Sequence, residues 1–211
     1  MTYTNFFLVP APLSVLAFFG TGALTAALLA AAAITALAGR SGPARKLGIA
    51  GAALPALYAL VLCAVGAATP GRTVPRGGEK FFCGVDCHIG YAITGLAESA
   101  ENGRRRIVVT LRARFDETTI SPARGNGPLR PDTLAAALVD SRGRRFAAEG
   151  GADALLAPLR PGESYAVDLV FRVPSDAGGL RLSLVGAEDV TRLLIGHERA
   201  FLAGETQLAL R

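Results

Sequence analysis

The first third of the chain contains two long uncharged runs of apolar residues. No charged side chain occurs in residues 1–39, where an apolar run of 23 residues (15–37) follows Pro10 and Pro12. Residues 47–69 form a second uncharged run of the same length. A helix needs about 20 apolar residues to cross a bilayer, and proline ends or kinks a helix interior. The pattern therefore predicts transmembrane helices over residues 15–37 and 47–69.

Two other interpretations of an apolar N-terminal run are a signal peptide and the buried core helix of a soluble protein. A signal peptide carries a basic region ahead of a shorter apolar stretch, and no basic residue precedes residues 15–37. A core helix of a soluble protein seldom reaches 23 residues without a polar face, whereas both runs have that length and no polar face. We therefore expect residues 1–69 to form a membrane hairpin.

Charge is distributed unevenly between the two parts of the chain. The net charge of +5 lies entirely in residues 1–78, whereas residues 79–211 carry 17 basic and 17 acidic side chains. A nucleic-acid-binding domain should have a net basic footprint, so we expect no nucleic-acid partner. Arg40, Arg45 and Lys46 lie between the apolar runs. Since positive loops stay in the cytoplasm, we expect the C-terminal domain outside the cell (inner) membrane.

The apolar period changes to two after a linker at residues 70–79 that is rich in proline and glycine. This alternation is typical of half-buried β-strands, and the expected strands and hairpin lie at residues 107–115, 138–147, 165–171, 180–184 and 200–210. A long polar loop interrupts them at residues 116–132. About seven short strands with turn signals between them are typical of an immunoglobulin-like β-sandwich. We therefore predict an all-β sandwich over residues 80–211.

The C-terminal part also resembles a known group of domains. The resemblance rests on the strings LVD…GRRF, LRPGESYAVDLVFRVPSDAGGLRL and LLIGHERAFLAGETQLAL. These strings are similar to those of bacterial membrane-anchored, immunoglobulin-like extracytoplasmic domains of unknown function, whose relatives include mycobacterial immunoprotective-antigen-like sandwiches. The resemblance covers residues 88–210. It implies a fold and a binding module, and it carries no catalytic residue across.

The motif Cys83-Gly-Val-Asp-Cys87-His88 holds most of the residues with reactive side chains. Outside the membrane, oxidising conditions allow a Cys83–Cys87 disulfide. Five extended residues place the two Cα atoms about 13 Å apart, too far for a bridge, so a disulfide requires a turn between them.

The alternative is a metal site, because thiolates and imidazoles bind copper or zinc. Its ligands would be Cys83, Cys87, His88 and the distant His197. The cysteine spacing looks like that of copper chaperones for respiratory oxidase, although those proteins have a thioredoxin fold. Two weaker interpretations are covalent haem attachment, whose usual motif is one residue shorter, and thiol–disulfide exchange.

Other chemical signatures are weak. Arg104, Arg105 and Arg106 could contact anionic lipid headgroups or could simply be the solvated start of a strand. The sequence therefore favours a non-enzymatic module, anchored in the lipid bilayer, that binds an envelope protein and needs no cofactor. The alternative function is copper or other metal handling, or thiol redox chemistry, at the cysteine motif.

Overall fold

The computed structural model describes residues 2–83, 87–119, 125–131, 134–186 and 189–211. The five predicted strand and hairpin segments all fall within these ranges. The predicted polar loop at residues 116–132 falls within them only in part.

The chain divides into two compact units. One unit, the sandwich, contains Met1–Asn5, Gly71–Asp189 and Glu205–Arg211. The other, the hairpin unit, contains Phe6–Pro70 and Val190–Gly204. The chain therefore leaves the sandwich before the helices and returns to it after them. It also contributes a late segment to the hairpin unit, which the sequence pattern does not predict.

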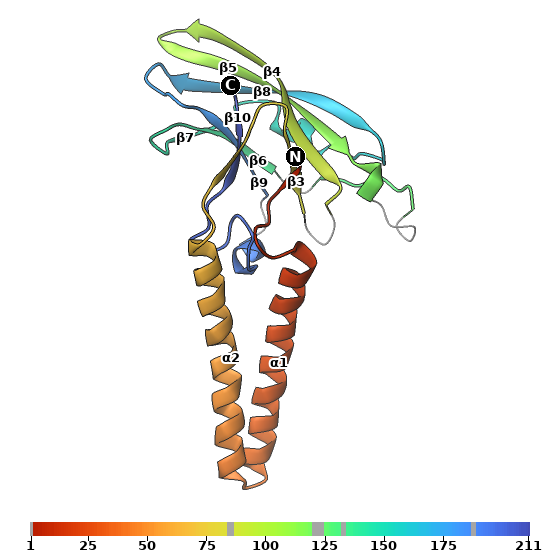
Figure 1. The fold of residues 1–211 in the computed structure, drawn as a ribbon, viewed down its shortest axis with the longest axis vertical. Coiled ribbons are helices and arrows are strands. Elements are labelled where there is room, and N and C mark those ends of the chain that lie inside the picture. Colours follow the sequence, from red (N-terminus) through yellow and green to blue (C-terminus); the bar gives the residue numbers. More distant parts are fainter. Residues whose placement is uncertain (1, 84–86, 120–124, 132–133, 187–188) are drawn as a thin grey trace. The chain divides into compact units, whose positions relative to one another are not determined.

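Two helices of 27 residues each, α1 (Ala11–Leu37) and α2 (Ser41–Ala67), form most of the hairpin unit (Figure 1). At 1.5 Å per residue each is about 40 Å long, which exceeds the ~30 Å hydrocarbon core of a bilayer. The most apolar window of α1 is 0% buried and that of α2 is 11% buried. Both helices are thus long and apolar enough to cross a membrane, and they are not packed inside a soluble core.

Both helices begin earlier than the predicted positions 15 and 47. Helix α1 starts at Ala11, with Pro10 as its N-cap and a proline in the first turn. Proline is tolerated there because the first amide groups of a helix have no intrahelical acceptor. Helix α2 starts at Ser41, so that two of the three loop cations lie in its first turns, and it continues through Pro55.

The sandwich consists of two five-stranded sheets (Figure 1). The first sheet has the order β1 (Thr2–Thr4), β3 (Glu79–Phe82), β4 (Ile89–Glu101), β5 (Arg104–Phe115) and β8 (Ser164–Pro174). The second has the order β2 (Arg72–Val74), β10 (Thr206–Ala209), β9 (Arg181–Gly186), β6 (Leu134–Val139) and β7 (Arg145–Ala147). The short 3₁₀ helices are η1 (Glu117–Thr119), η2 (Ala152–Leu156) and η3 (Asp189–Leu193). Strands β1 and β2 pair in parallel with β3 and β10, and the other pairs are antiparallel.

Alternate side chains of the central strands fill the space between the sheets. Five alternate residues of β5 are buried and face inward: Ile107, Val109, Leu111, Ala113 and Phe115. From the second sheet they meet buried leucines of β6 and β9, namely Leu138, Leu182 and Leu184. The period-two pattern therefore predicted the interior correctly at β5, β8 and β9, because burial on one face is what produces the alternation.

Strand β4 was not predicted because its pattern does not alternate. Its first five residues, Ile89 to Ile93, are all buried. The register of β4 against β5 then shifts between Ile93 and Gly95, and a β-bulge of this kind changes which side chains face the core. The last predicted strand, at residues 200–210, is shorter than expected, because β10 covers only Thr206–Ala209.

Lys80 of β3 is fully buried between the sheets. Its Nζ donates hydrogen bonds to the carbonyl oxygens of Leu184 (3.0 Å) and Thr206 (2.8 Å) in the opposite sheet. The ammonium group also lies 4.7 Å from the ring centroid of Phe82. This lysine therefore links the two sheets through main-chain acceptors.

Candidate functional site

Cys83 and Cys87 form a disulfide, with Cα atoms 4.2 Å apart. The buried side chain of Asn5 fixes the main chain of Cys83 from both sides. Asn5 Nδ2 donates to the Cys83 carbonyl at 3.2 Å, and the Cys83 amide donates to Asn5 Oδ1 at 2.8 Å. The predicted disulfide is thus present, and the N-terminal segment holds one of its ends in place.

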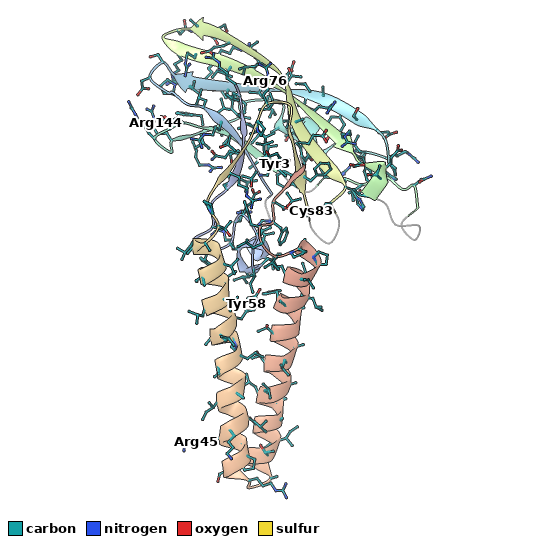
Figure 2. The ribbon with its side chains drawn as sticks, in the orientation of Figure 1. Tyr3, Arg45, Tyr58, Arg76, Cys83 and Arg144 are labelled. Carbon is teal, nitrogen blue, oxygen red and sulfur yellow. A yellow bond between two sulfur atoms is a disulfide. The ribbon has the colours of Figure 1, made fainter. Side chains whose placement is uncertain are left out.

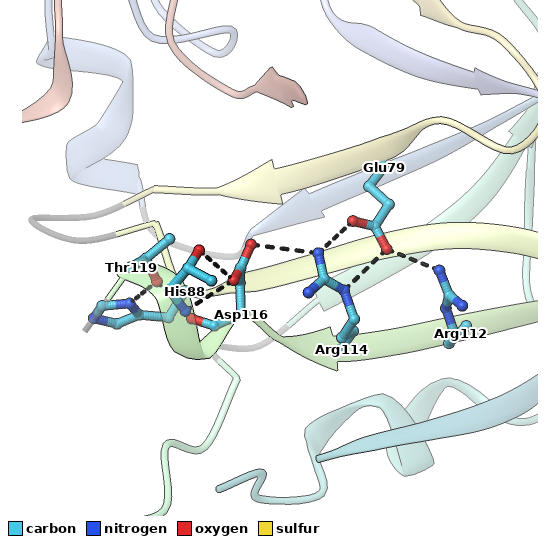
Figure 3. Close-up of polar contacts among 7 residues, drawn as sticks. Glu79, His88, Arg112, Arg114, Asp116 and Thr119 are labelled. Atoms are coloured by element: carbon cyan, nitrogen blue, oxygen red, sulfur yellow. Dashed lines mark hydrogen bonds and ion pairs between the residues drawn. The ribbon is translucent and has the colours of Figure 1, made fainter. Parts of the chain in front are cut away.

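His88 follows the disulfide and is buried. Its ring stacks on Phe115, with centroids 5.2 Å apart and planes inclined by 11°. Its Nδ1 lies 2.6 Å from the hydroxyl oxygen of Thr119, as Figure 3 shows. These contacts fix the imidazole at the end of β5.

His197 belongs to the hairpin unit, whereas Cys83, Cys87 and His88 belong to the sandwich. The His197 ring meets Phe6 edge-on at 4.9 Å, and its Nδ1 accepts a hydrogen bond from the Arg199 amide at 3.1 Å.

The four predicted metal ligands are not brought together as one group in the described ranges of the chain, where no cluster of three or more potential ligands occurs. Both sulfur atoms are bonded to each other. A metal site at this motif would need the thiolate form, so copper binding stays a prediction for the reduced protein.

A chain of ion pairs crosses the outer face of the first sheet beside His88 (Figure 3). Glu79 of β3 accepts hydrogen bonds from Arg112 at 2.9 Å and from Arg114 at 2.7 Å. Arg114 also lies 3.4 Å from Asp116. These contacts join β3 to β5, which are not neighbours in the sheet.

The ion pairs can reach from β3 across β4 to β5 because β4 carries small residues at this point. Gly90 lies opposite Arg114 and Ala92 lies opposite Arg112. A Cβ at position 90 would press against the ring of Phe81. The arrangement supports the sheet and has the chemistry of a structural clamp.

The charges in this clamp shift the acidity of its carboxyl groups. Hydrogen bonding from Arg114 lowers the pKa of Glu79 below its usual value. Hydrogen bonding from Thr118 likewise lowers the pKa of Asp116. A carboxyl whose pKa is depressed in the folded state adds stability that is present above its unfolded pKa and is lost as the pH falls through the folded value.

Glu79→Gln is therefore expected to make the free energy of unfolding depend less on pH in the acidic range. At neutral pH the variant should lose about 1 kcal/mol of unfolding free energy, because one partly exposed charge-assisted contact becomes neutral. Between about pH 5 and pH 3 the wild type should lose this difference and converge on the variant. Urea unfolding across this pH range measures the difference in unfolding free energy between the two proteins. A difference that stays constant with pH would contradict the stabilising role of the ionised Glu79.

At the opposite end of β5, a cleft of about 470 Å³ opens between the two sheets. Its apolar lining is formed by Leu96, Ile107, Leu180 and Leu210. Its charged lining is formed by Glu98, Arg105, Arg181 and Arg211. The volume falls in the range of about 300–1,000 Å³ that is typical of small-molecule sites, so this cleft is the candidate functional site.

Arg105 lies in phase with the buried Ile107 of β5, so its side chain is directed between the sheets. Its Nη1 donates to Glu98 at 2.8 Å, and its Nη2 donates to the carbonyl oxygen of Ala177. Its Nε is buried and has no hydrogen-bond partner among the described residues. A charge at an inward position of an alternating strand is the sequence signal that could have identified this residue.

Positive charge exceeds negative charge around the cleft. Glu98 also pairs with Arg211 at 2.7 Å, so two guanidinium groups share one carboxylate. Arg181 lies 3.5 Å from the amide oxygen of Gln207 and forms no ion pair in the part of the chain that the structure describes. Guanidinium groups bind carboxylates and phosphates in a bidentate manner. The cleft can therefore accept an anionic group with an apolar body behind it.

Comparison with known proteins adds little beyond the fold. No protein-family model matches the chain, and no curated protein matches it. Similar solved structures include an uncharacterised β-sandwich protein from Clostridium difficile 630, with 12% identity, 68% of this chain and 96% of that chain covered, and a TM-score of 0.39. An ApaG protein from Pseudomonas aeruginosa PAO1 has 16% identity, 45% and 91% coverage, and a TM-score of 0.27. The chain is thus described by its own geometry, as two long apolar helices and a β-sandwich.

Proposed function

We propose that this protein is a membrane-anchored, extracytoplasmic binding module whose cleft holds an anionic group of its partner. The anchor is the pair α1 and α2, whose apolar windows are almost entirely exposed. Apolar side chains exposed on this scale are unfavourable in water. A bilayer removes that cost, and a helix satisfies its own backbone hydrogen bonds there.

Two observations support placing the sandwich outside the cytoplasm. Arg40, Arg45 and Lys46 lie at the turn of the hairpin, and a positive loop favours the cytoplasmic side. The Cys83–Cys87 disulfide lies in the sandwich, and disulfides persist in oxidising compartments. Charge and redox chemistry thus agree on one orientation.

The order of the strands supports an immunoglobulin-like sandwich. Strands β4, β5 and β8 lie in one sheet, and β10, β9, β6 and β7 lie in the other. With β4 as strand A, these sheets have the orders A-B-E and G-F-C-C′, which match the core of immunoglobulin-related sandwiches. Strands β1, β2 and β3 extend the two sheets beyond that core.

The observation that carries the binding proposal is that Arg105 and Arg211 share the single carboxylate of Glu98 beside an apolar cleft. Hydrophobic walls supply affinity for an apolar body, and a few charged groups fix its orientation. The partner would therefore present a carboxylate or phosphate group next to an apolar segment. A binding role fits these groups better than catalysis, because the carboxylate is paired with two arginines.

Hexanoate and hexyl phosphate are suitable soluble probes of the cleft, with hexylammonium as the probe of opposite charge. At about 0.5 kcal/mol per heavy atom, hexanoate is expected to bind with a dissociation constant of about 1 mM. Arg211→Glu should weaken binding at least about tenfold, because it replaces an attractive charge by a repulsive one beside Glu98. Titration calorimetry on the full chain in nanodiscs measures both constants.

Arg160→Glu is the matched control, since Arg160 is exposed and lies outside the cleft lining. It changes the net charge by the same amount and should leave hexanoate binding unchanged. Equal binding by wild type and Arg211→Glu, or hexylammonium binding as tight as that of hexanoate, would rule out the proposed site.

A further inference from the structure

Exposed large apolar side chains are confined to the hairpin unit in the described part of the chain. Most lie on α1 and α2, as expected of membrane helices. The others lie outside α1 and α2 and are Leu8, Val190, Leu193, Phe201 and Leu202. Four of these five belong to residues 190–204, which we call the docked segment.

The docked segment packs on the C-terminal half of α2. Ile195 and Ala200 form a small buried cluster with Leu62. The hydroxyl of Tyr58, labelled in Figure 2, donates to the carbonyl oxygen of Leu193 at 2.6 Å. A Cβ at Gly66 would overlap the carbonyl oxygen of Phe201. Glycine at this helical position therefore allows the segment to lie directly against α2.

The docked segment is also tied to the residues just before α1. The Phe7 amide donates to the Gly196 carbonyl at 2.7 Å, and Phe6 forms an antiparallel bridge with His197. A Cβ at Gly196 would overlap the Phe7 carbonyl oxygen. The segment is therefore held at the ends of both helices that are distant from the loop between them.

Its buried and exposed side chains point in different directions. Ile195 and Ala200 are buried, whereas Phe201 is 51% exposed and Leu202 is 71% exposed. Leu8, in the bend just before α1, is 73% exposed. Leu8 and Leu202 have positive φ values of 59° and 68°, a conformation that residues with a branched apolar side chain rarely adopt. The fold thus holds these leucines outward in turns where a polar residue or glycine would be expected.

We propose that Phe201, Leu202 and Leu8 insert into the bilayer at the boundary between headgroups and acyl chains. This inference rests on the proposed membrane anchor. Leu193 of the same segment lines an apolar cavity of about 680 Å³ together with Phe18 of α1 and Tyr58 of α2, so the segment and both helices share an apolar surface there. Helices of about 40 Å extend past a hydrocarbon core of about 30 Å, so their ends lie where interfacial segments bind.

The absence of tryptophan from the sequence makes a direct test available. Phe201→Trp places a single fluorophore in the docked segment, and Leu202→Trp is a second variant in case the first disturbs the contact with Gly66. Each full chain is reconstituted in phosphatidylcholine vesicles whose acyl chains carry bromine either near the headgroup or near the chain end. Both tryptophans are expected to emit at short wavelength and to be quenched most by the shallow bromine.

Two further variants separate this inference from the anchor itself. Phe19→Trp lies on the exposed face of α1 and should be quenched by bromine deep in the bilayer, whereas Arg142→Trp lies at an exposed turn of the sandwich and should not be quenched. An unquenched fluorophore in the Phe19→Trp variant would overturn the anchor. Quenching at position 19 without quenching at positions 201 and 202 would overturn only the inserted segment. Blue-shifted but unquenched emission at 201 and 202 would indicate a protein contact, such as a second copy, and would also overturn it.

Discussion

Lys80→Ala is expected to lower the free energy of unfolding by about 3–5 kcal/mol. Truncation leaves a cavity in a core that is otherwise filled, which by itself costs a few kcal/mol. It also removes the donor to the Leu184 and Thr206 carbonyls, and a buried acceptor without a partner costs about 1–3 kcal/mol. Pulse proteolysis in urea, on the full chain in detergent micelles, measures the loss.

Lys80→Met separates the cavity from the hydrogen bonds. Methionine fills similar space without a donor, so we expect a smaller loss of about 1–3 kcal/mol. Arg76→Ala is the control, since it removes a positive charge from an exposed turn (Figure 2) and should change stability by less than about 0.5 kcal/mol. A Met variant as stable as the wild type would mean that burying the ammonium costs as much as its contacts return.

The elements that the sequence predicted are those whose local pattern reflects their surroundings. Helices α1 and α2 are apolar along their length, and their most apolar windows are only 0% and 11% buried. Strand β5 has one buried and one partly exposed face, so alternation identifies it. In both cases the environment is uniform along the element, and a window of a few residues is enough to recognise it.

The elements that were missed depend on partners far away in the sequence. Strand β1 has three residues and exists because it pairs with β3. Strand β2 lies within the predicted linker and pairs with β10, more than 130 residues later. Residues 200–204 of the docked segment were assigned to a last strand over residues 200–210, whereas the structure limits that strand to Thr206–Ala209. Only the packing of these residues on α2 distinguishes the two outcomes.

The residues with reactive or charged side chains follow the same rule: features set by neighbours in the sequence could be predicted, and features set by distant residues could not. The cysteine spacing was local, so the need for a turn between Cys83 and Cys87 could be stated from the sequence, and the bridge is present. The metal site with His88 and His197 depends on residues that are far apart in the sequence and belong to different units, and it stays a prediction. Arg105 was noticed only as one of three arginines in a row. Its inward direction follows from its phase with Ile107, which the strand alternation already contained.

A reporter joined after Arg211 is expected to be active only on the outer side of the membrane. Alkaline phosphatase joined after Arg211 should be active, and a fluorescent protein exported to this position by the general secretory route should be dark. When the same reporters are inserted after Gly39, alkaline phosphatase should be inactive and the fluorescent protein should fluoresce. Strand β1 and residues 71 onward belong to one folded unit, so both ends of the hairpin must lie on the same side of the bilayer. The positive residues Arg40, Arg45 and Lys46 at its turn favour the cytoplasm, which places that unit outside.

The same topology predicts the state of the cysteines. Reversing the charges at Arg40, Arg45 and Lys46 to glutamate removes the signal that retains the loop in the cytoplasm, so a large share of the molecules should invert. Inverted molecules place Cys83 and Cys87 in a reducing compartment, where both should react with maleimide after rapid lysis. The wild type should show neither thiol free, and Cys63 in α2 provides an internal reference. Free thiols in the wild type together with an active cytoplasmic reporter would place the sandwich inside the cell and remove the support that the disulfide gives to the orientation.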